Sequence, residues 1–302
     1  MADSHLGIGG WVRGDNRVRR TAFSKWAAEI ARSGPRIIPA LHSPPEMGYA
    51  GCMETCSANG LSIQVHETYE AMSHAAADFI CRELRQRPNL LLCASAGATP
   101  TRTYELLAAR HNRRPKLFAR LRVLQIDEWG GLASDDSATC QADLRTKLLD
   151  PLGIARNRYM GFRTEATDLE ADCGRVARWL AANGPIDVCI LGLGNNGHVA
   201  MNEPAEALAC HAHVTALTES SRRHAMLKNL AKKPRHGLTL GMADILRSRR
   251  ILLLVNGRRK RAALGRLSKP GVTTRFPASF VRLHPNATVL CDRETAAAPP
   301  LH

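Results

Sequence analysis

The sequence predicts an α/β protein: a mostly parallel, doubly wound sheet flanked by helices, in a modified Rossmann-like arrangement and a single domain. Short apolar segments alternate along the chain with longer segments whose apolar residues recur at helical spacing. Such alternation is typical of a parallel sheet with helices on both faces. The chain has 302 residues, of which 44% are hydrophobic and 23% are charged, near the average for globular proteins. These observations favour one large α/β core.

The expected helices have recognisable beginnings or ends. Segment 66–87 carries apolar residues on one side and stops before Pro88, which cannot continue a helix without strain. Segment 99–110 has Pro100 in its first turn, where proline is tolerated. The expected helices are 66–87, 99–110, 138–149, 168–183 and 258–267.

The expected strands are short and apolar. Segment 89–94 is a run of the kind found in strands that are covered on both faces. The expected strands are 89–94, 122–126, a short one near Tyr159, 186–191, 213–217 and 251–255. The regular pattern places one domain at residues 61–292.

Both ends of the chain differ from this regular region. Residues 1–60 contain glycine-rich and proline-rich patches, the arginine cluster Arg17–Arg20 and one helical segment, 21–32. This composition predicts a poorly ordered extension. Residues 293–302 form a short tail rich in alanine and proline.

Composition limits the partners that we expect. The net charge is +15, but aromatic residues make up only 5% of the chain and no nucleic-acid-binding motif is present, so we expect no nucleic-acid partner. No apolar run is long enough to span a membrane and no secretion signal is evident, so we expect a cytoplasmic protein without a membrane partner. Nine scattered cysteines favour buried reduced thiols over disulfides or a zinc site.

Three expected strand ends carry unusual residues, and ligands of such sheets bind beyond the C-terminal ends of the strands. The first is a turn of small residues that comprises Ser95, Ala96, Gly97, Ala98 and Thr99. Small side chains let backbone N–H groups approach an anion at the start of a helix, and the two hydroxyls add donors. The turn lacks the ending of a nucleoside-triphosphate loop. A simple phosphate ester is the expected ligand, and an ordinary turn with Thr99 as the N-cap is the alternative.

The second strand end carries two adjacent carboxylates, Asp127 and Glu128, followed by Trp129. Because neighbouring side chains on a strand point to opposite faces, one carboxylate is expected to face the cleft while the other turns away. A carboxylate against an apolar wall gains basicity through desolvation and can abstract a proton from carbon. The alternative is a pair that forms salt bridges or caps a turn.

The third strand end is the glycine-rich segment 192–198, which continues to Pro204. Its G-x-G-x-x-G pattern resembles a dinucleotide loop, but that interpretation needs a long helix starting inside the motif. Pro204 and the turn-forming Asn-Asn-Gly sequence argue against such a helix. The loop instead presents His198 and Glu203, a potential acid–base pair. Further along, Arg222 and Lys260 are candidates to close on a phosphate.

Together these segments resemble the glucosamine-6-phosphate deaminase/isomerase family. The similar motifs are the turn Ala96–Pro100, the strand end Asp127–Trp129 and the block Gly192–Pro204, and the segments Leu283–Pro285 and Val289–Asp292 are similar to the last strand of the family. The resemblance covers about 61–292. The Asn-Glu-Pro part of the third motif is highly specific, whereas the phosphate turn is not.

The resemblance implies a role for each matching residue. Asp127 would move the proton between C2 and C1, while His198 would assist opening of the sugar ring with the support of Glu203. The phosphate would be bound by Ser95, Ala96, Gly97, Ala98, Thr99, Arg222 and Lys260. The family usually has an aspartate where this chain has Asn196, which can orient His198 by hydrogen bonding but supplies no charge.

The resemblance also implies the reaction. A 2-amino-2-deoxyhexose 6-phosphate would become a ketose 6-phosphate and ammonia, without a metal or an organic cofactor. Asn196 before Gly-His, Trp129 after Asp-Glu, and Cys210-His211 are more similar to the galactosamine-6-phosphate branch. The expected partner is a small sugar phosphate, and the number of subunits, including a homo-oligomer, stays open.

Three alternatives remain. A 6-phosphogluconolactonase would be expected to carry Asp-Glu-Arg at the second strand end and a Ser-Leu-Phe-Pro-like block after Gly-His, and this chain has neither. A sugar-phosphate-sensing regulator would need a helix-turn-helix, but residues 1–60 contain one convincing helix. A binding protein without catalysis is the third alternative, because Asn196 replaces an acidic residue.

Overall fold

The computed structural model describes residues 52–58 and 61–296, and for the segment 52–58 only the backbone. All of them belong to one structural unit, residues 48–302. The expected helix 21–32 and the cluster Arg17–Arg20 lie outside the described residues.

The main sheet has eight strands in the order β1-β2-β11-β10-β7-β3-β4-β6. Only the edge pair β1–β2 is antiparallel, and all other neighbours run parallel. The strands are β1 (Cys52–Ala58), β2 (Leu61–His66), β3 (Leu91–Ala94), β4 (Arg122–Gln125), β6 (Tyr159–Met160), β7 (Val188–Gly192), β10 (Arg250–Val255) and β11 (Ala287–Asp292). The expectation of a mostly parallel sheet is confirmed.

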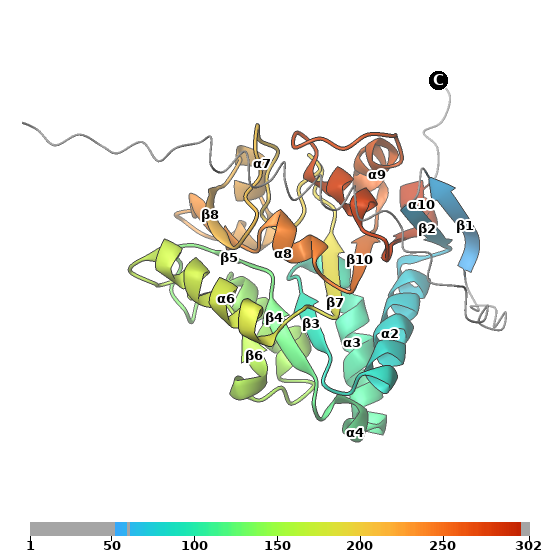
Figure 1. Cartoon of the computed structure of the whole chain (residues 1–302), viewed down its shortest axis with the longest axis horizontal. Coiled ribbons are helices and arrows are strands. Elements are labelled where there is room, and N and C mark those ends of the chain that lie inside the picture. Colours follow the sequence, from blue (N-terminus) through green and yellow to red (C-terminus); the bar gives the residue numbers. More distant parts are fainter. Residues whose placement is uncertain (1–51, 59–60, 297–302) are drawn as a thin grey trace, which may run out of the picture. The chain divides into compact units, whose positions relative to one another are not determined.

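Helices cover both faces of this sheet, as Figure 1 shows. The longer helices are α2 (Tyr69–Gln86), α3 (Ala98–Arg113), α6 (Leu169–Asn183) and α9 (Arg261–Leu267). The shorter ones are α4 (Pro115–Phe118), α5 (Cys140–Leu144), the π-helix η1 (Arg145–Leu149), α7 (Glu219–Arg222), α8 (Met242–Leu246) and α10 (Arg293–Ala296). Short 3₁₀ turns are η2 (Arg156–Arg158), η3 (Ala225–Leu227), η4 (Arg258–Lys260) and η5 (Pro277–Leu283).

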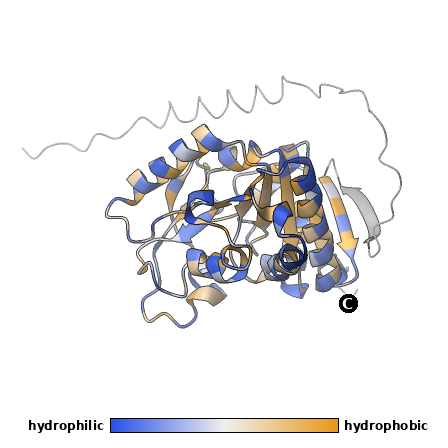
Figure 2. Cartoon of the chain, turned by 90° about the horizontal axis from the view of Figure 1, so that it is seen from below, coloured by the Kyte–Doolittle hydropathy of each residue, from blue (hydrophilic) through white to orange (hydrophobic). Residues whose placement is uncertain are grey.

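Local sequence sets the ends of the main helices. Thr68 precedes α2, and its hydroxyl accepts a hydrogen bond from the Ala71 N–H at 3.1 Å, which is N-capping. Asp168 caps α6 in the same way at 2.9 Å. Every residue of β3 is buried, as expected for a central strand covered on both faces. Figure 2 shows hydrophobic residues concentrated on the strands and hydrophilic residues on the outer sides of the helices.

A second, antiparallel sheet is a feature that the sequence did not predict. It consists of β5 (Asp127–Trp129), β9 (His236–Thr239) and β8 (His213–Ala216) in that order. The expected strand 213–217 corresponds to β8, but β9 was not expected, and the antiparallel pairing of β5 and β8 with β9 joins separate segments of the chain. The sheet depends on a close approach at Gly237, where a β-carbon would overlap the Met201 sulfur.

The structured region extends beyond the predicted range 61–292 at both ends. β1 pairs with β2 across the predicted boundary at Leu61, and α10 begins at Arg293, inside the predicted tail. The sequence signal for β1 is the dipeptide Asn59-Gly60, which is typical of two-residue hairpin turns.

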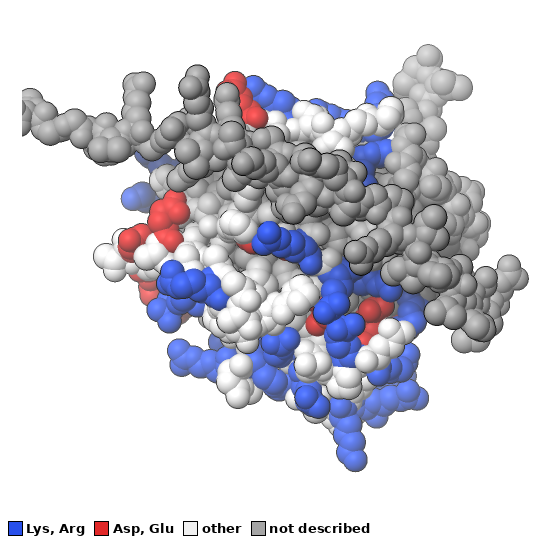
Figure 3. Space-filling view, viewed as in Figure 1, with Lys and Arg blue, Asp and Glu red and all other residues white. Residues whose placement is uncertain are grey.

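Basic residues are widely distributed over the face seen in Figure 3, including the lower edge where α4 lies. Several are paired with carboxylates, such as Arg102 with Glu70 at 2.6 Å and Arg110 with Asp78 at 2.7 Å. Within residues 52–58 and 61–296, no helix is long and apolar enough to cross a bilayer.

Candidate active site

The sheet order brings the predicted strand ends together. β10, β7, β3 and β4 are consecutive neighbours and run parallel, so their C-terminal ends lie along one edge of the sheet. The turn after β3, the β5 segment after β4, the loop after β7 and Lys260 after β10 all leave from this edge. The structure therefore gathers the predicted site residues at a common edge.

The turn after β3 ends in α3, whose N-cap is Gly97 with φ of 104°. Thr99 therefore lies inside the first turn of α3 and is not the N-cap. Its hydroxyl donates to Asn256 Oδ1 at 2.8 Å. The Gly97 N–H donates to Asp143 Oδ2 at 2.9 Å. Two of the donors that the sequence assigns to phosphate thus have protein acceptors.

The other members of the turn are Ser95, Ala96 and Ala98. The backbone carbonyl of Ser95 accepts a hydrogen bond from the Tyr104 hydroxyl at 2.8 Å, while the buried Ser95 Oγ has no hydrogen-bond partner among the residues that the structure describes. The Ala98 carbonyl accepts from Tyr69 at 3.0 Å. These contacts fix the backbone of the turn and leave the Ser95 hydroxyl available.

Asp127 is the first residue of β5 and pairs with Thr239 of β9. Burial, followed by the nearby charge of Glu128, raises its pKa to about 7, while the thiol of Cys140 acts in the opposite direction. A carboxylate with such a pKa is both ionised and basic near neutrality, which suits a general base.

The side chain of Glu128 is buried and holds the backbone through hydrogen bonds. Its carboxylate accepts hydrogen bonds from three backbone N–H groups, those of Trp129 at 2.7 Å and of Cys140 and Gln141 at 2.8 Å each, and from Gln125 Nε2 at 2.8 Å. Burial raises its pKa, and these hydrogen bonds oppose the shift. The expectation that one carboxylate of the pair turns away is confirmed, because Glu128 anchors the start of α5.

The loop after β7 is a compact turn. The Gly197 N–H donates to the Gly194 carbonyl at 3.0 Å, and the Gly194 N–H donates to the His198 carbonyl at 2.9 Å. Gly197 has φ of 91°, and a β-carbon there would overlap the Phe276 ring. No helix starts within the loop, which agrees with the rejection of a dinucleotide motif.

His198, Asn196 and Glu203 lie together in this loop. The Nδ1 atom of His198 is 3.6 Å from Glu203 Oε2, an ion-pair distance that is too long for a hydrogen bond. Asn196 Nδ2 donates to the same oxygen at 2.9 Å, and Asn196 Oδ1 accepts from the His198 N–H at 3.1 Å. Asn196 therefore bridges the backbone of His198 and the carboxylate.

The second oxygen of Glu203 binds the segment before Arg222. It accepts hydrogen bonds from the hydroxyls of Ser221 and Thr218. Burial acts to raise the pKa of Glu203, but the nearby imidazole of His198 and the hydrogen bonds from Ser221 and Asn196 outweigh it and lower the pKa to about 2. Glu203 is an anion that connects the loop to α7.

Contacts with β9 place this loop next to Asp127. The Met201 N–H donates to Thr239 Oγ1 at 3.3 Å, and Asn202 Nδ2 donates to the Leu240 carbonyl at 2.9 Å. Thr239 is the register partner of Asp127. The acid–base loop and the candidate base are thus held by the same strand.

The two predicted basic residues are positioned differently. Arg222 ends α7, with Nη1 3.5 Å from Glu219 Oε2. Its buried Nε has no hydrogen-bond partner within residues 52–58 and 61–296. Lys260 is the last residue of η4, and burial lowers its pKa. Both belong to segments that begin at the common edge or pack against it.

Sequence reasoning missed four residues of this region: Asp143, Ser221, His224 and Asn256. Asp143 binds Gly97, Asn256 binds Thr99 and Ser221 binds Glu203, and each of these hydrogen bonds joins two separate segments, so no local pattern identifies it. His224 faces Trp129, with ring centroids 5.7 Å apart.

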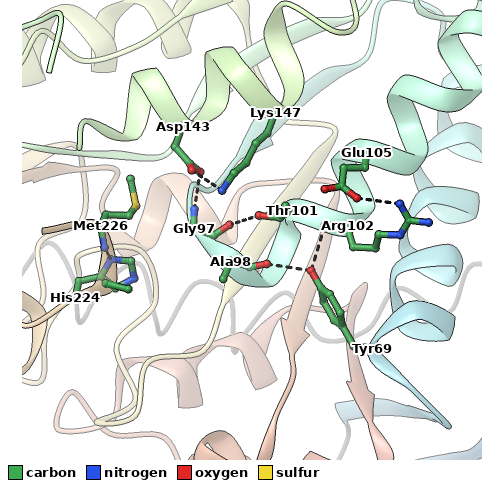
Figure 4. Close-up of a pocket in the computed structure, with 11 residues that line it drawn as sticks. Tyr69, Gly97, Ala98, Thr101, Arg102, Glu105, Asp143, Lys147, His224 and Met226 are labelled. Carbon is green, nitrogen blue, oxygen red and sulfur yellow. Dashed lines mark hydrogen bonds and ion pairs between the residues drawn. The ribbon is translucent and has the colours of Figure 1, made fainter. Parts of the chain in front are cut away.

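A cavity of about 540 Å³ lies beside the turn, and Figure 4 shows residues that line it. Its lining includes Gly97, Ala98, Asp143, Lys147 and His224. Asp143 accepts from Gly97 and pairs with Lys147. Among residues 52–58 and 61–296, no group of three or more His, Cys, Asp and Glu side chains could hold a metal ion.

The fold and the site together define an α/β protein with ionisable groups gathered at the carboxyl edge of a parallel sheet. Residues 65–290 match the family described as glucosamine-6-phosphate isomerases/6-phosphogluconolactonase. The chain belongs to this family and is an enzyme of its isomerase/deaminase type, which confirms the resemblance stated above.

Individual relatives agree with this placement. AgaI of Escherichia coli (strain K12), which is named as a candidate deaminase, is 36% identical over 74% of this chain and 89% of its own. Glucosamine-6-phosphate deaminase 1 of Bacillus subtilis (strain 168) is 33% identical over 78% of this chain and 98% of its own.

Solved structures show the same fold. A glucosamine-6-phosphate deaminase described as monomeric, of the NagB superfamily, matches with a TM-score of 0.73 and 32% identity over 78% of this chain and 98% of its own. The 6-phosphogluconolactonase of Trypanosoma brucei matches with a TM-score of 0.62 and 24% identity over 78% of this chain and 97% of its own. The second likeness concerns the fold alone.

Proposed function

We propose that this enzyme converts a 2-amino-2-deoxyhexose 6-phosphate and water into a ketose 6-phosphate and ammonia. The printed activity of the deaminase relatives supports the reaction class. The proposal rests mainly on the common edge of the sheet. There Asp127, with its raised pKa, pairs with β9, and the loop that contains His198 and Glu203 is hydrogen-bonded to the same strand.

Unsatisfied polar atoms support a polar ligand at this edge. Ser95 Oγ, Trp129 Nε1, His198 Nδ1 and Arg222 Nε are buried and have no hydrogen-bond partner among the described residues. Buried polar groups in folded proteins nearly always have partners. Hydroxyl and phosphate oxygens of a sugar phosphate supply the acceptors that such donors require.

In the proposed mechanism the phosphate is the anchor and the sugar is the reacting part. Arg222, Lys260 and the free hydroxyl of Ser95 bind the phosphate. His198 transfers a proton at the ring oxygen, which opens the ring and exposes the C1 aldehyde. The ionised Glu203 stabilises the protonated imidazole.

Asp127 then moves a proton along the open chain. Its carboxylate removes the C2 proton to give an enolamine and returns a proton to C1, which gives a ketimine. Water adds to the ketimine and ammonia leaves, so atoms balance without an oxidant or reductant. Positioning and one acid–base pair supply the acceleration.

We propose galactosamine 6-phosphate as the preferred substrate, with tagatose 6-phosphate as the product. Asn196, Trp129 and the Cys210-His211 pair support this choice through their resemblance to that branch. In the structure, Trp129 lies directly after the carboxylate pair, and its indole N–H has no hydrogen-bond partner in the described part of the chain. Such a donor can distinguish the orientation of a sugar hydroxyl.

Measuring ammonia release from galactosamine 6-phosphate and from glucosamine 6-phosphate tests both the proposed reaction and the proposed choice of epimer. We expect release from both epimers, with a higher kcat/KM for the galacto form. Hydrolysis of 6-phosphogluconolactone without ammonia release from either amino sugar would reject the proposed reaction. A higher kcat/KM for the gluco form would reject only the choice of epimer.

A further inference from the structure

His224 stands at the phosphate turn, although no sequence motif includes it. It is the N-cap of η3, and its Nδ1 atom accepts a hydrogen bond from the Met226 N–H at 3.4 Å. An imidazole that accepts at Nδ1 carries its proton at Nε2 when it is neutral. The Nε2–H group makes no hydrogen bond to any residue in the described part of the chain.

Three observations place this imidazole at the turn. Its Cε1 atom lies 3.9 Å from the point where a β-carbon on Gly97 would lie, so the ring stands over the start of α3. The centroid of the ring lies 5.7 Å from that of Trp129, and the two ring planes are tilted by 42°. It also lines the cavity beside the turn, as Figure 4 shows.

The charges around His224 indicate an anion site. Desolvation lowers its pKa, and the charges of His198 and Lys260 lower it further, while Asp143 raises it. Lys260 and the N-terminus of the sixteen-residue helix α3 act near the imidazole in the sense that favours an anion, whereas the Asp143 carboxylate, which pairs with Lys147, acts in the opposite sense. The cation and the helix N-terminus favour a bound anion.

The phosphate turn needs an additional donor. The Thr99 hydroxyl donates to Asn256, and the Gly97 N–H donates to Asp143. A phosphate dianion offers three oxygen atoms that each accept hydrogen bonds. Because the Thr99 hydroxyl and the Gly97 N–H already have protein acceptors, the turn offers fewer hydrogen-bond donors to a phosphate than the sequence predicted.

We propose that His224 binds the substrate phosphate through Nε2–H and completes the site formed by Ser95, Arg222 and Lys260. This inference rests on the proposed function for the identity of the phosphate ester. The ring of Trp129 lies beside the imidazole, with the centroids 5.7 Å apart. His224 is thus a binding residue for the end of the substrate that does not react.

Two substitutions separate this role from a structural one. His224→Asn keeps an acceptor at the position of Nδ1 for the Met226 N–H but removes the distal donor. His224→Gln places an amide N–H near the position of Nε2. We expect His224→Asn to raise the dissociation constant for inorganic phosphate about tenfold, the usual loss for a hydrogen bond to a charged acceptor. We expect His224→Gln to retain most of the affinity.

The measurement is isothermal titration of the full-length enzyme and its variants with inorganic phosphate. His74→Gln is the matched control, because His74 is half exposed on α2 and pairs with Glu70 at 3.2 Å. Lys260→Ala removes another proposed ligand of the phosphate and serves as the comparison within the same site. In turnover, His224→Asn should raise KM with little change in kcat, because the phosphate is bound equally in the ground and transition states.

The outcomes distinguish this inference from the proposed function. Phosphate affinity that is unchanged in His224→Asn but reduced in Lys260→Ala overturns the role of His224. An equal loss in His224→Asn and His224→Gln also overturns it, because the effect then follows the ring and not the donor. If His224→Asn loses phosphate affinity while the wild type releases no ammonia from either epimer, the anion site stands and the proposed reaction fails.

Discussion

At the residue scale, the pKa values of the two carboxylates Asp127 and Glu203 are shifted in opposite directions. Asp127 has few compensating hydrogen bonds, and burial raises its pKa to about 7. Glu203 is also buried, but its hydrogen bonds and the imidazole of His198 lower its pKa to about 2. One group can therefore accept a proton near neutrality, while the other stays charged and stabilises an imidazolium.

Asp127→Asn should abolish exchange of the C2 proton with solvent while binding persists, because an amide cannot take the proton. We expect kcat to fall at least about 10²-fold, the lower range for loss of a general base. Deuterium incorporation at C2, followed by NMR, measures the step. Asp135→Asn is the control, since Asp135 is exposed in the following loop. Normal exchange in Asp127→Asn would remove Asp127 as the base.

The raised pKa of Asp127 predicts the pH dependence of the reaction. The ionised form is the base, so kcat/KM should rise with pH and level off above about pH 7. The measurement is a pH profile of ammonia release at low substrate concentration. An acidic limb centred near the ordinary pKa of an aspartate would contradict this assignment.

The same burial predicts a stability difference. Because the pKa of Asp127 is raised by folding, the folded protein binds an additional proton between the unfolded and folded pKa values, and stability falls as pH rises through that interval. Asp127→Asn should therefore melt at a higher temperature than the wild type at pH 8 and at nearly the same temperature at pH 4. Thermal unfolding at the two pH values tests this. Equal melting temperatures at pH 8 would show that the ionised carboxylate carries no such cost.

At the element scale, the loop after β7 depends on close packing against η5. Gly197 combines a positive φ of 91° with a position where a β-carbon would overlap the ring of Phe276. The Ala278 N–H also donates to the Gly197 carbonyl at 2.8 Å. The geometry of His198 is thus set by a segment about eighty residues further along the chain.

Gly197→Ala should reduce both stability and activity. Gly131 provides a matched control, because it has φ of 83° and open space at the position of a β-carbon. We expect Gly131→Ala to cost about 1 kcal/mol from the backbone conformation alone. Gly197→Ala should cost about 1–3 kcal/mol more through overpacking. Urea unfolding of both variants measures the difference, and equal losses would show that Phe276 adjusts freely.

At the scale of the whole molecule, the main sheet sets the edge on which the site stands, and the small antiparallel sheet holds the candidate base. In the main sheet, β1 is the edge strand that pairs antiparallel with its neighbour, and it precedes the predicted start of the domain. Its backbone groups cover β2, which would otherwise be an open edge.

Two truncations test where the folded unit begins. A chain that starts at Gly48 should retain the melting temperature and activity of the full protein, because it keeps the unit 48–302. A chain that starts at Leu61 loses β1 and should associate through the exposed edge of β2. Size-exclusion chromatography and thermal unfolding compare the two. Identical behaviour of both chains would show that β1 does not protect the sheet.

The sequence determined the features that depend on neighbouring residues. Apolar runs and helical spacing predicted the central strands and helices, because these patterns reflect burial of one segment at a time. The proximity of His198 and Glu203 was predictable for the same reason, since five residues of one loop separate them. That Asp127 lies at the same edge follows from the general rule for parallel sheets.

Only the tertiary structure decided the partners of these residues. The sheet order, the pairing of Asp127 with Thr239 and the contacts of Glu203 with α7 join segments that are far apart in the chain. Asp143 and Asn256 take up donors of the phosphate turn across 46 and 157 residues, respectively. No local pattern specifies such pairs, because their free energy arises when separate elements pack and bury polar groups together.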